Sequence, residues 1–193
     1  MYRLFLGRIS SLSQLALEPD LVRNAPQGPR RSVWLAGRAM LSRAVSPLPE
    51  IRYGEQGKPE FDATHGLWFN LSHSAGSIVL LLSDEGPVGC DIEALRPHAS
   101  WQQLANAVFT SAEHALLEQE APANRLRAFW RIWTRKEAMV KHSGGSVWQI
   151  VSVDSTAPLH RHVSDLQHEG LSIATCTSSP FSPAPDGIEW IIP

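Results

Sequence analysis

Hydrophobic residues recur along the chain with two different periods, and the changes between them predict the order of the elements. Runs that are apolar, or that alternate with polar residues and end in turn residues, predict strands. We expect strands at residues 2–9, 51–53, 58–61, 67–71, 77–83, 88–93, 148–153, 171–177 and 188–192. Spacings of three and four predict helices at residues 29–44, 100–108, 111–120 and 124–142. The proline-rich segment 178–187 is expected to be a loop.

Both halves of this pattern mix helices with strands that look antiparallel. Such mixing favours an α+β fold over a doubly wound α/β fold. The 193 residues, 43% hydrophobic and 19% charged, have ordinary globular composition and can bury one core or two small joined cores. We therefore expect an α+β protein made of two parts, residues 1–98 and 99–193.

Several classes of protein are disfavoured by the same pattern. The longest aliphatic run, residues 78–82, is too short for a membrane span, and the first residues lack the apolar stretch of a signal peptide. Cys90 and Cys176 form no CxxC pair that would indicate zinc or redox chemistry. The sequence thus predicts a cytoplasmic protein with no membrane contact and no thiol chemistry.

Charge is distributed unevenly along the chain. A net charge of −2 argues against a dedicated nucleic-acid binder. However, residues 21–49 contain five arginines and no acid, and residues 125–141 contain six bases and one acid, Glu137. These two basic segments indicate local anion binding, although solvated helix faces would explain them equally well.

Glu137 is the most unusual residue of the predicted long helix. At about 100° per residue it falls on the apolar stripe, together with Leu126, Trp130, Trp133 and Val140. A buried carboxylate needs a cation, a metal ion or several hydrogen-bond donors. One interpretation is a structural ion pair with Lys141, one turn further on. The other is a functional site. The arginines of the opposite face are typical of solvent or partner contacts: Arg127, Arg131 and Arg135.

Asp91 and Glu93 end a predicted strand and point to the same side of it. Two adjacent carboxylates repel unless a cation lies between them, and oxygen-only ligands suit Mg²⁺. Taken alone, this D-x-E pattern is also typical of an exposed strand end. Combined with Glu137 and with the nearby Lys136 and Lys141, it indicates metal-assisted phosphate chemistry.

The segment FNLSHS, residues 69–74, is a third candidate site. Ser72, His73 and the following small residues lie at a strand end, where backbone N–H groups and an imidazolium can bind a phosphate. An ordinary turn histidine is the alternative interpretation of His73.

These motifs together resemble a known enzyme family. The chain is similar to 4'-phosphopantetheinyl transferases of the larger Sfp type, and over nearly its whole length to bacterial holo-acyl-carrier-protein synthases of the AcpT kind. The resemblance rests on five ordered motifs: GKP at 57–59, FNLSHS at 69–74, VGCDIE at 88–93, F-x-x-x-E at 109–113 and FWRIWTRKEAMVK at 129–141. Two departures are Cys90, where an aliphatic residue is usual, and an N-terminal basic cluster made only of arginine.

The resemblance implies coenzyme A as donor, Mg²⁺ as cofactor and a serine of an apo acyl carrier protein as acceptor. It implies two similar α+β halves related by a pseudo-twofold axis, with the active site in the cleft between them. The implied metal ligands are Asp91, Glu93 and Glu137. Glu137, Lys141 and His73 are the implied catalytic residues, with Glu137 or a metal-bound water as the base. Further residues are implied for coenzyme A, namely Ser72, Lys136 and Lys58, with Arg31 and Arg38 as candidates for the 3'-phosphate, and Glu113 as a possible accessory acid.

Two other functions remain as alternatives at this point. A Mg²⁺-dependent nuclease also uses clustered acids and a lysine, but net charge −2 does not suit a long polyanion, and Glu137 and Lys141 lie on a helix rather than a strand. An inactive carrier-binding module would not need the intact acids. We therefore expect a monomeric transferase that binds coenzyme A and a carrier protein, and no nucleic acid or membrane.

Overall fold

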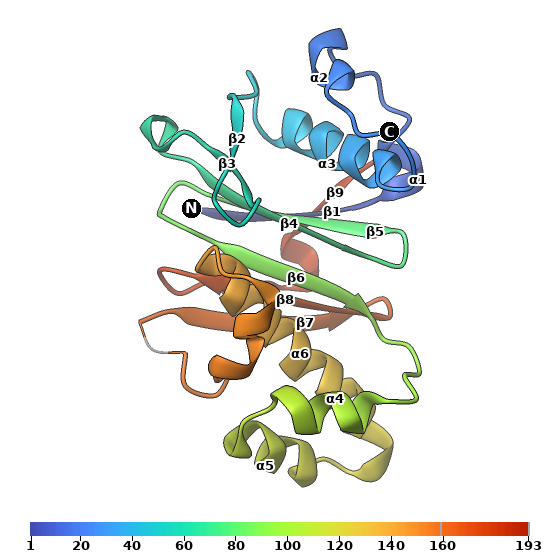
Figure 1. Cartoon of the computed structure of the whole chain (residues 1–193), viewed down its shortest axis with the longest axis vertical. Coiled ribbons are helices and arrows are strands. Elements are labelled where there is room, and N and C mark those ends of the chain that lie inside the picture. The colour runs from blue at the N-terminus through green and yellow to red at the C-terminus, as the bar shows by residue number, and fades with distance from the viewer. Residues whose placement is uncertain (159, 193) are drawn as a thin grey trace.

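The computed structural model describes residues 1–158 and 160–192 and contains two main β-sheets that pack against each other (Figure 1). The first sheet has the strand order β4-β5-β1-β9, in which β5 pairs antiparallel with β1 and β4, and β9 pairs parallel with β1. These strands are β1 (Tyr2–Arg8), β4 (Trp68–Ser74), β5 (Ser77–Ser83) and β9 (Ile188–Ile191). The second sheet is antiparallel with the order β6-β8-β7: β6 (Gly89–Ala94), β7 (His162–His168) and β8 (Leu171–Thr177).

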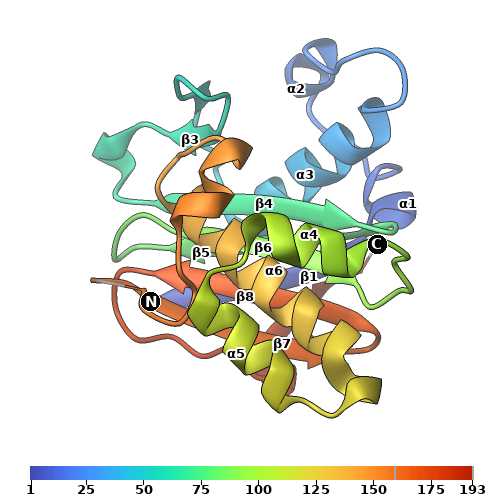
Figure 2. The same ribbon diagram turned by 60° about the horizontal axis from the view of Figure 1, so that its bottom comes forward.

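Helices cover the outer face of each sheet (Figures 1 and 2). On the first sheet lies α3 (Arg31–Ala44), beside the short helices α1 (Ile9–Leu12) and α2 (Pro19–Arg23) and the hairpin of β2 (Ile51–Tyr53) and β3 (Pro59–Phe61). On the second sheet lies α6 (Arg125–His142), and α4 (Trp101–Val108) and α5 (Ser111–Gln119) pack on α6. Short 3₁₀ helices complete the chain: η1 (Ala63–His65), η2 (Pro122–Asn124), η3 (Val147–Ser152) and η4 (Pro185–Gly187).

The two sheets share a hydrophobic core made by their inner faces. Leu4, Leu6 and Leu81 of the first sheet pack against Ile92 and Ile173 of the second. All five are at most 1% exposed, as expected for residues that alternate with outward-facing neighbours along a strand. The predicted α+β class is confirmed.

The halves predicted as residues 1–98 and 99–193 exchange strands. β6 belongs to the second sheet although it precedes residue 98, and β9, near the end of the chain, returns to the first sheet beside β1. Along the sequence, the chain therefore changes from the first sheet to the second between β5 and β6. The D-x-E motif lies on β6, the first strand after this change.

Two predictions of local structure are wrong. Residues 148–153 form most of η3 instead of a strand, because Ser146 and Gln149 make a reciprocal capping box that starts a helical turn. The strand β7 was not predicted, because its sequence HVSDLQH contains only two aliphatic residues, Val163 and Leu166. The described helices also lack the combination of length and hydrophobicity that crossing a lipid bilayer requires.

Candidate active site

The seam between β4 and β6 brings the predicted site residues together. These edge strands belong to different sheets and are joined by polar side chains of β4 that recur at every second position. Asn70 accepts a hydrogen bond from the Cys90 backbone at 2.8 Å. Ser72 donates to Asp91 Oδ1 at 2.8 Å, and Ser74 donates to Glu93 Oε2 at 2.6 Å. Because strand residues two apart share a face, this period directs all three side chains at β6, and Ser72 and Ser74 at the two acids of the D-x-E motif.

The acids reach the helix because β6 lies very close to α6. A Cβ atom on Gly89 would lie 2.1 Å from the Ala138 carbonyl oxygen and 2.4 Å from the His142 nitrogen. No side chain fits in this space, so glycine is required at the start of β6. The close approach places Asp91 opposite Glu137 and Lys141 of α6.

Lys141 connects the two strands of the seam. Its Nζ donates to Asp91 Oδ1 at 2.6 Å and to Ser72 Oγ at 2.9 Å. Burial alone would lower the pKa of Lys141, but the neighbouring Asp91 carboxylate outweighs burial and leaves the pKa raised. The structural alternative, an ion pair of Lys141 with Glu137, is thus replaced by a pair with Asp91.

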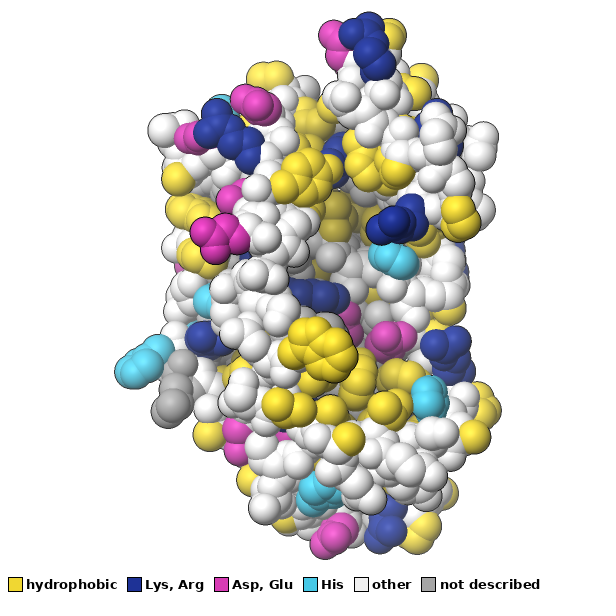
Figure 3. Space-filling view, in the orientation of Figure 1, with side chains coloured by type: hydrophobic (Ala, Val, Ile, Leu, Met, Phe, Trp, Pro, Cys, Tyr) yellow, Lys and Arg dark blue, Asp and Glu magenta, His cyan; other side chains and the backbone are white. Residues whose placement is uncertain are grey.

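Glu137 lies at the edge of the apolar face of α6, where it lines an open cavity of about 360 Å³. The other lining residues are Leu71, Ser72, His73, Asp91, Glu93, Trp133 and Lys141. Figure 3 shows one face of the molecule, with a hollow near its middle. Basic, acidic and histidine side chains gather in this hollow, and apolar side chains lie directly below them. The cavity therefore combines three carboxylates, one ammonium and one imidazole at the seam of the two sheets.

The carboxylates of this cavity are short of positive charge. Burial, followed by the charge of Asp91, raises the pKa of Glu137, and burial likewise raises the pKa of Glu93. Asp91 is 4% exposed, and its Oδ2 atom is buried and has no hydrogen-bond partner among the described residues. A hard divalent cation such as Mg²⁺ would satisfy this set of oxygen donors. Within the described residues, no three acidic, histidine or cysteine side chains are arranged closely enough to form a ready-made metal site.

His73 lies on the same cavity, beside Lys141. Partial burial and the Lys141 ammonium lower the pKa of His73. The sequence predicted an imidazolium at this position, whereas the lowered pKa favours the neutral imidazole, which can still donate one N–H group to a phosphate oxygen.

Two predicted site residues lie elsewhere. Lys136 and Glu113 are both fully buried and form an ion pair at 2.7 Å. Glu113 also accepts from the backbone nitrogens of Thr110 and Ser155, and Lys136 also donates to the Val153 carbonyl. Neither Lys136 nor Glu113 therefore lines the cavity of Asp91, Glu93 and Glu137, where a phosphate contact and an accessory acid were expected. The pair ties α5 and the segment after η3 to α6.

The remaining basic residues are also separated from the acids. Arg38 is 6% exposed, stacks on Trp34 at 4.6 Å and donates to the Tyr53 hydroxyl at 2.7 Å, in a hollow of about 650 Å³ beside α3. Burial lowers the pKa of Arg38. Arg31 begins α3, one residue after Arg30. The Lys58 amine donates to the backbone carbonyls of Val88, just before β6, and of Lys141 in α6.

Sequence reasoning missed the roles of several residues at the β4–β6 seam and in these two hollows. Asn70 and Ser74 could have been found from the period of two in FNLSHS. Trp133 was assigned to the apolar stripe but lines the acid cavity, one turn before Glu137. Trp34 and Tyr53 carry no motif and become visible only in three dimensions.

Comparison with known proteins settles the family. Residues 87–181 match the model of the 4'-phosphopantetheinyl transferase superfamily. The chain is 60% identical over 191 residues to the 4'-phosphopantetheinyl transferase AcpT of Escherichia coli K12, covering 99% of this chain and 98% of that protein. The chain belongs to the 4'-phosphopantetheinyl transferase superfamily.

Other members of this superfamily show the same relation, at similar identity and at lower identity. AcpT of Salmonella typhi is 61% identical over 188 residues, with 97% of this chain and 98% of that protein covered. The 4'-phosphopantetheinyl transferase HetI of Nostoc is 32% identical over 105 residues, which cover 53% of this chain and 44% of HetI. The resemblance, the fold and the transferase activity predicted from the sequence are confirmed. A nuclease and an inactive binding module find no support.

Proposed function

We propose that this transferase moves the 4'-phosphopantetheine arm of coenzyme A to a serine of an apo acyl carrier protein in the cavity of Asp91, Glu93 and Glu137. The observation that carries the proposal is the contact of Lys141 with Asp91 and Ser72. This contact sets an ammonium among three carboxylates in an open cavity, which is the charge arrangement that a metal-bound pyrophosphate needs.

Asp91, Glu93 and Glu137 would hold Mg²⁺, because their oxygens face one cavity, two of them have raised pKa values and Asp91 has an unpaired buried oxygen. When bound, the ion would supply the positive charge that neutralises the pyrophosphate oxygens of coenzyme A. Lys141 and His73 would contact phosphate oxygens from the opposite wall.

Glu137 is the proposed base. Its carboxylate would accept the proton of the carrier serine while the serine oxygen attacks the β-phosphorus. The bond from this phosphorus to the bridging oxygen then breaks, and adenosine 3',5'-bisphosphate leaves with the electron pair. The raised pKa of Glu137 favours its role as a proton acceptor.

The hollow beside α3 is the proposed site for the nucleotide end of coenzyme A. Trp34 and Tyr53 offer aromatic surfaces for a base, and Arg38 keeps further N–H groups that can bind a phosphate. Arg31 remains a candidate for the same 3'-phosphate. We propose that the enzyme works as a monomer in the cytoplasm, where its buried free thiols, Cys90 and Cys176, stay reduced.

The test is an intact-mass assay with coenzyme A, Mg²⁺ and a panel of apo carrier proteins. A gain of one phosphopantetheine on a carrier serine is expected for the wild-type enzyme, and none for Asp91→Ala. Glu118→Gln removes an exposed acid of α5 and serves as the matched control that keeps activity. Normal transfer by Asp91→Ala, or no transfer to any carrier by the wild type, contradicts the proposal.

A further inference from the structure

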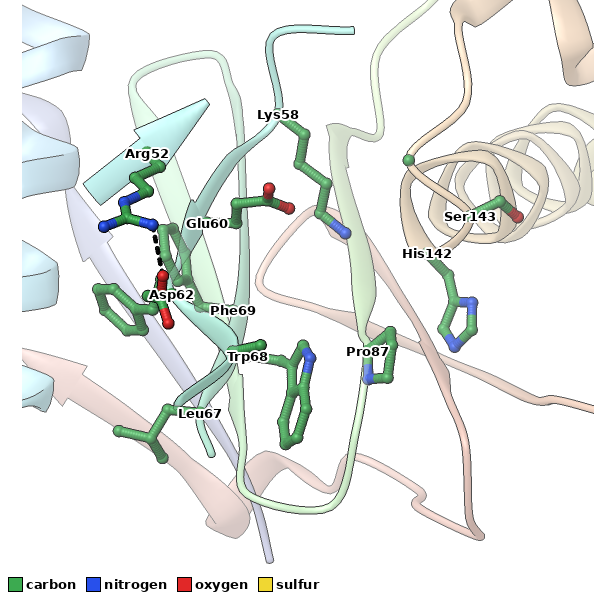
Figure 4. A pocket seen from close by; sticks show the side chains of 13 residues that line it. Arg52, Lys58, Glu60, Asp62, Leu67, Trp68, Phe69, Pro87, His142 and Ser143 are labelled. Atoms are coloured by element: carbon green, nitrogen blue, oxygen red, sulfur yellow. Dashed lines mark hydrogen bonds and ion pairs between the residues drawn. The ribbon is translucent and has the colours of Figure 1, made fainter. Parts of the chain in front are cut away.

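Lys58 spans the boundary between the two sheets. It precedes β3 in the β2–β3 hairpin, on the side of the first sheet, and its side chain points from the hairpin toward β6 (Figure 4). Its Nζ donates to the Val88 carbonyl at 3.0 Å and to the Lys141 carbonyl at 2.8 Å. These acceptors lie on the second-sheet side, 30 and 83 residues away along the chain.

Both acceptors are backbone oxygens at the ends of elements, one at the end of α6 and one just before β6. The Lys141 carbonyl belongs to the last turn of α6, at the negative end of the helix dipole, where it also accepts a hydrogen bond from the Gly144 backbone nitrogen at 3.2 Å. The Val88 carbonyl immediately precedes Gly89, at the close approach of β6 to α6. An ammonium is well suited to bind both oxygens at once, since it has three donors and no fixed plane.

These contacts hold the two segments that carry the acid cavity. Lys58 binds the backbone of Lys141, whose side chain binds Asp91 and Ser72. It also binds the backbone of Val88, three residues before Asp91. A shift of the hairpin would therefore move both sides of the Lys141–Asp91 contact.

We propose that Lys58 is a positioning residue that fixes the hairpin to β6 and to the end of α6 and so holds Lys141 and Asp91 in register. This inference rests on the transferase function proposed above. It differs from the nucleotide contact expected from the GKP motif. Lys58 does not line the cavity of the acids; its side chain borders a separate cavity of about 380 Å³, together with Glu60, Trp68 and His142 (Figure 4).

The test compares Lys58→Met with Arg52→Met in the full chain. Arg52 lies in the same hairpin and has the same charge, but its ionic contacts, Glu50 and Asp62, are in the first half. For Lys58→Met we expect kcat to fall about ten-fold or more, because small displacements of reacting groups are costly. We expect the Kd of adenosine 3',5'-bisphosphate, measured by calorimetry, to change less than about two-fold, since no phosphate contact is lost. Arg52→Met should match the wild type, and Lys58→Arg, which keeps donors, should recover part of kcat.

A second readout is independent of transfer. Hydrogen exchange of the intact protein should be faster in Lys58→Met than in Arg52→Met at the backbone amides of the hairpin and of residues 142–145. If the methionine variant does not fold, the same comparison is made with Lys58→Gln, whose amide group is shorter and uncharged but still a hydrogen-bond donor. Weaker adenosine bisphosphate binding with unchanged kcat would make Lys58 a nucleotide ligand and overturn the inference, as would unchanged exchange. A wild-type protein without transferase activity would instead contradict the proposed function.

Discussion

Lys136 and Glu137 are neighbours on one helix, and their surroundings give them opposite roles. Successive helical residues differ by about 100° in direction, so Lys136 points toward α5 while Glu137 points into the cleft. Lys136 has a buried partner, Glu113, and no exposed surface. Glu137 lines an open cavity among other acids, and its pKa is raised by burial and by Asp91. One side chain is thus structural, and the next is the proposed base.

Lys136→Met should therefore reduce stability strongly. It leaves the Glu113 carboxylate buried without its cation, which typically costs about 3–5 kcal/mol. Urea unfolding measures this loss. The double variant Glu113→Gln/Lys136→Met should recover part of it, because no buried charge remains. A Lys136→Met protein as stable as the wild type would show that the pair does not support the fold.

Glu137→Gln should instead reduce transfer and leave the stability of the fold intact. We expect transfer to fall by about 10²-fold or more, because the proposed base and one oxygen ligand are lost together. The melting temperature without Mg²⁺ should hold or rise, because repulsion from Asp91 and Glu93 is relieved. Intact-mass rates and thermal melts test both parts. Near-normal transfer would exclude Glu137 as the base.

At the scale of elements, the site depends on how closely β6 and α6 pack. Gly89 allows this contact, and the side chains of Asn70, Ser72 and Ser74 attach β4 on the other side of β6. The acids thus lie on a strand that is held from both sides. Loops contribute little to this arrangement, which suits a site that must keep several charges in fixed positions.

Gly89→Ala should separate these two elements. The added methyl group would lie 2.1 Å from a backbone oxygen of α6, so the helix or strand must shift. We expect a loss of at least about 1–3 kcal/mol in unfolding free energy, as for other overpacked sites, and a large loss of transfer. Gly187→Ala is the matched control, because a methyl group added there would have no atom within 4 Å. Equal stability of both variants would contradict the close packing of β6 on α6.

At the scale of the whole molecule, the pKa of His142 depends on the contact between the two halves. It ends α6 and lines the same cavity as Lys58. Burial, together with the charges of Arg161 and Lys58, lowers its pKa from 6.5 to about 4. Its Nε2 atom is buried, and no residue in the described part of the chain forms a hydrogen bond with it. His142 is therefore neutral in the folded protein at neutral pH.

This shift predicts a loss of stability in mild acid. Below pH 6.5 the unfolded chain takes up a proton at His142 that the folded chain binds only near pH 4, so the contribution present above pH 6.5 is lost as the pH falls between these values. Urea unfolding between pH 7.5 and 4.5 should show a steeper decline for the wild type than for His142→Gln. His160→Gln, at an exposed position, is the control and should follow the wild type. Identical slopes for wild type and His142→Gln would contradict the shift.

The sequence by itself determined the family, the α+β class, most elements and the acids of the site. It could do so because period and turn chemistry are local, and because DIE, SHS and KEAMVK are each contiguous in the sequence. It also identified Glu137 as a carboxylate that needs a partner or a role. Residues 148–153 and β7 were missed where a local capping box or a polar strand sequence gave the opposite signal.

Only the tertiary structure decided which charged side chains form pairs. Lys141 could have paired with Glu137 one turn away, but the close approach of β6 brings Asp91 to it instead. The family motifs imply a phosphate contact for Lys136 and a nucleotide contact for Lys58, yet Lys136 is buried against Glu113 and Lys58 binds backbone carbonyls of the other half. Ion pairing depends on distances between segments far apart in sequence, and a linear pattern does not contain those distances.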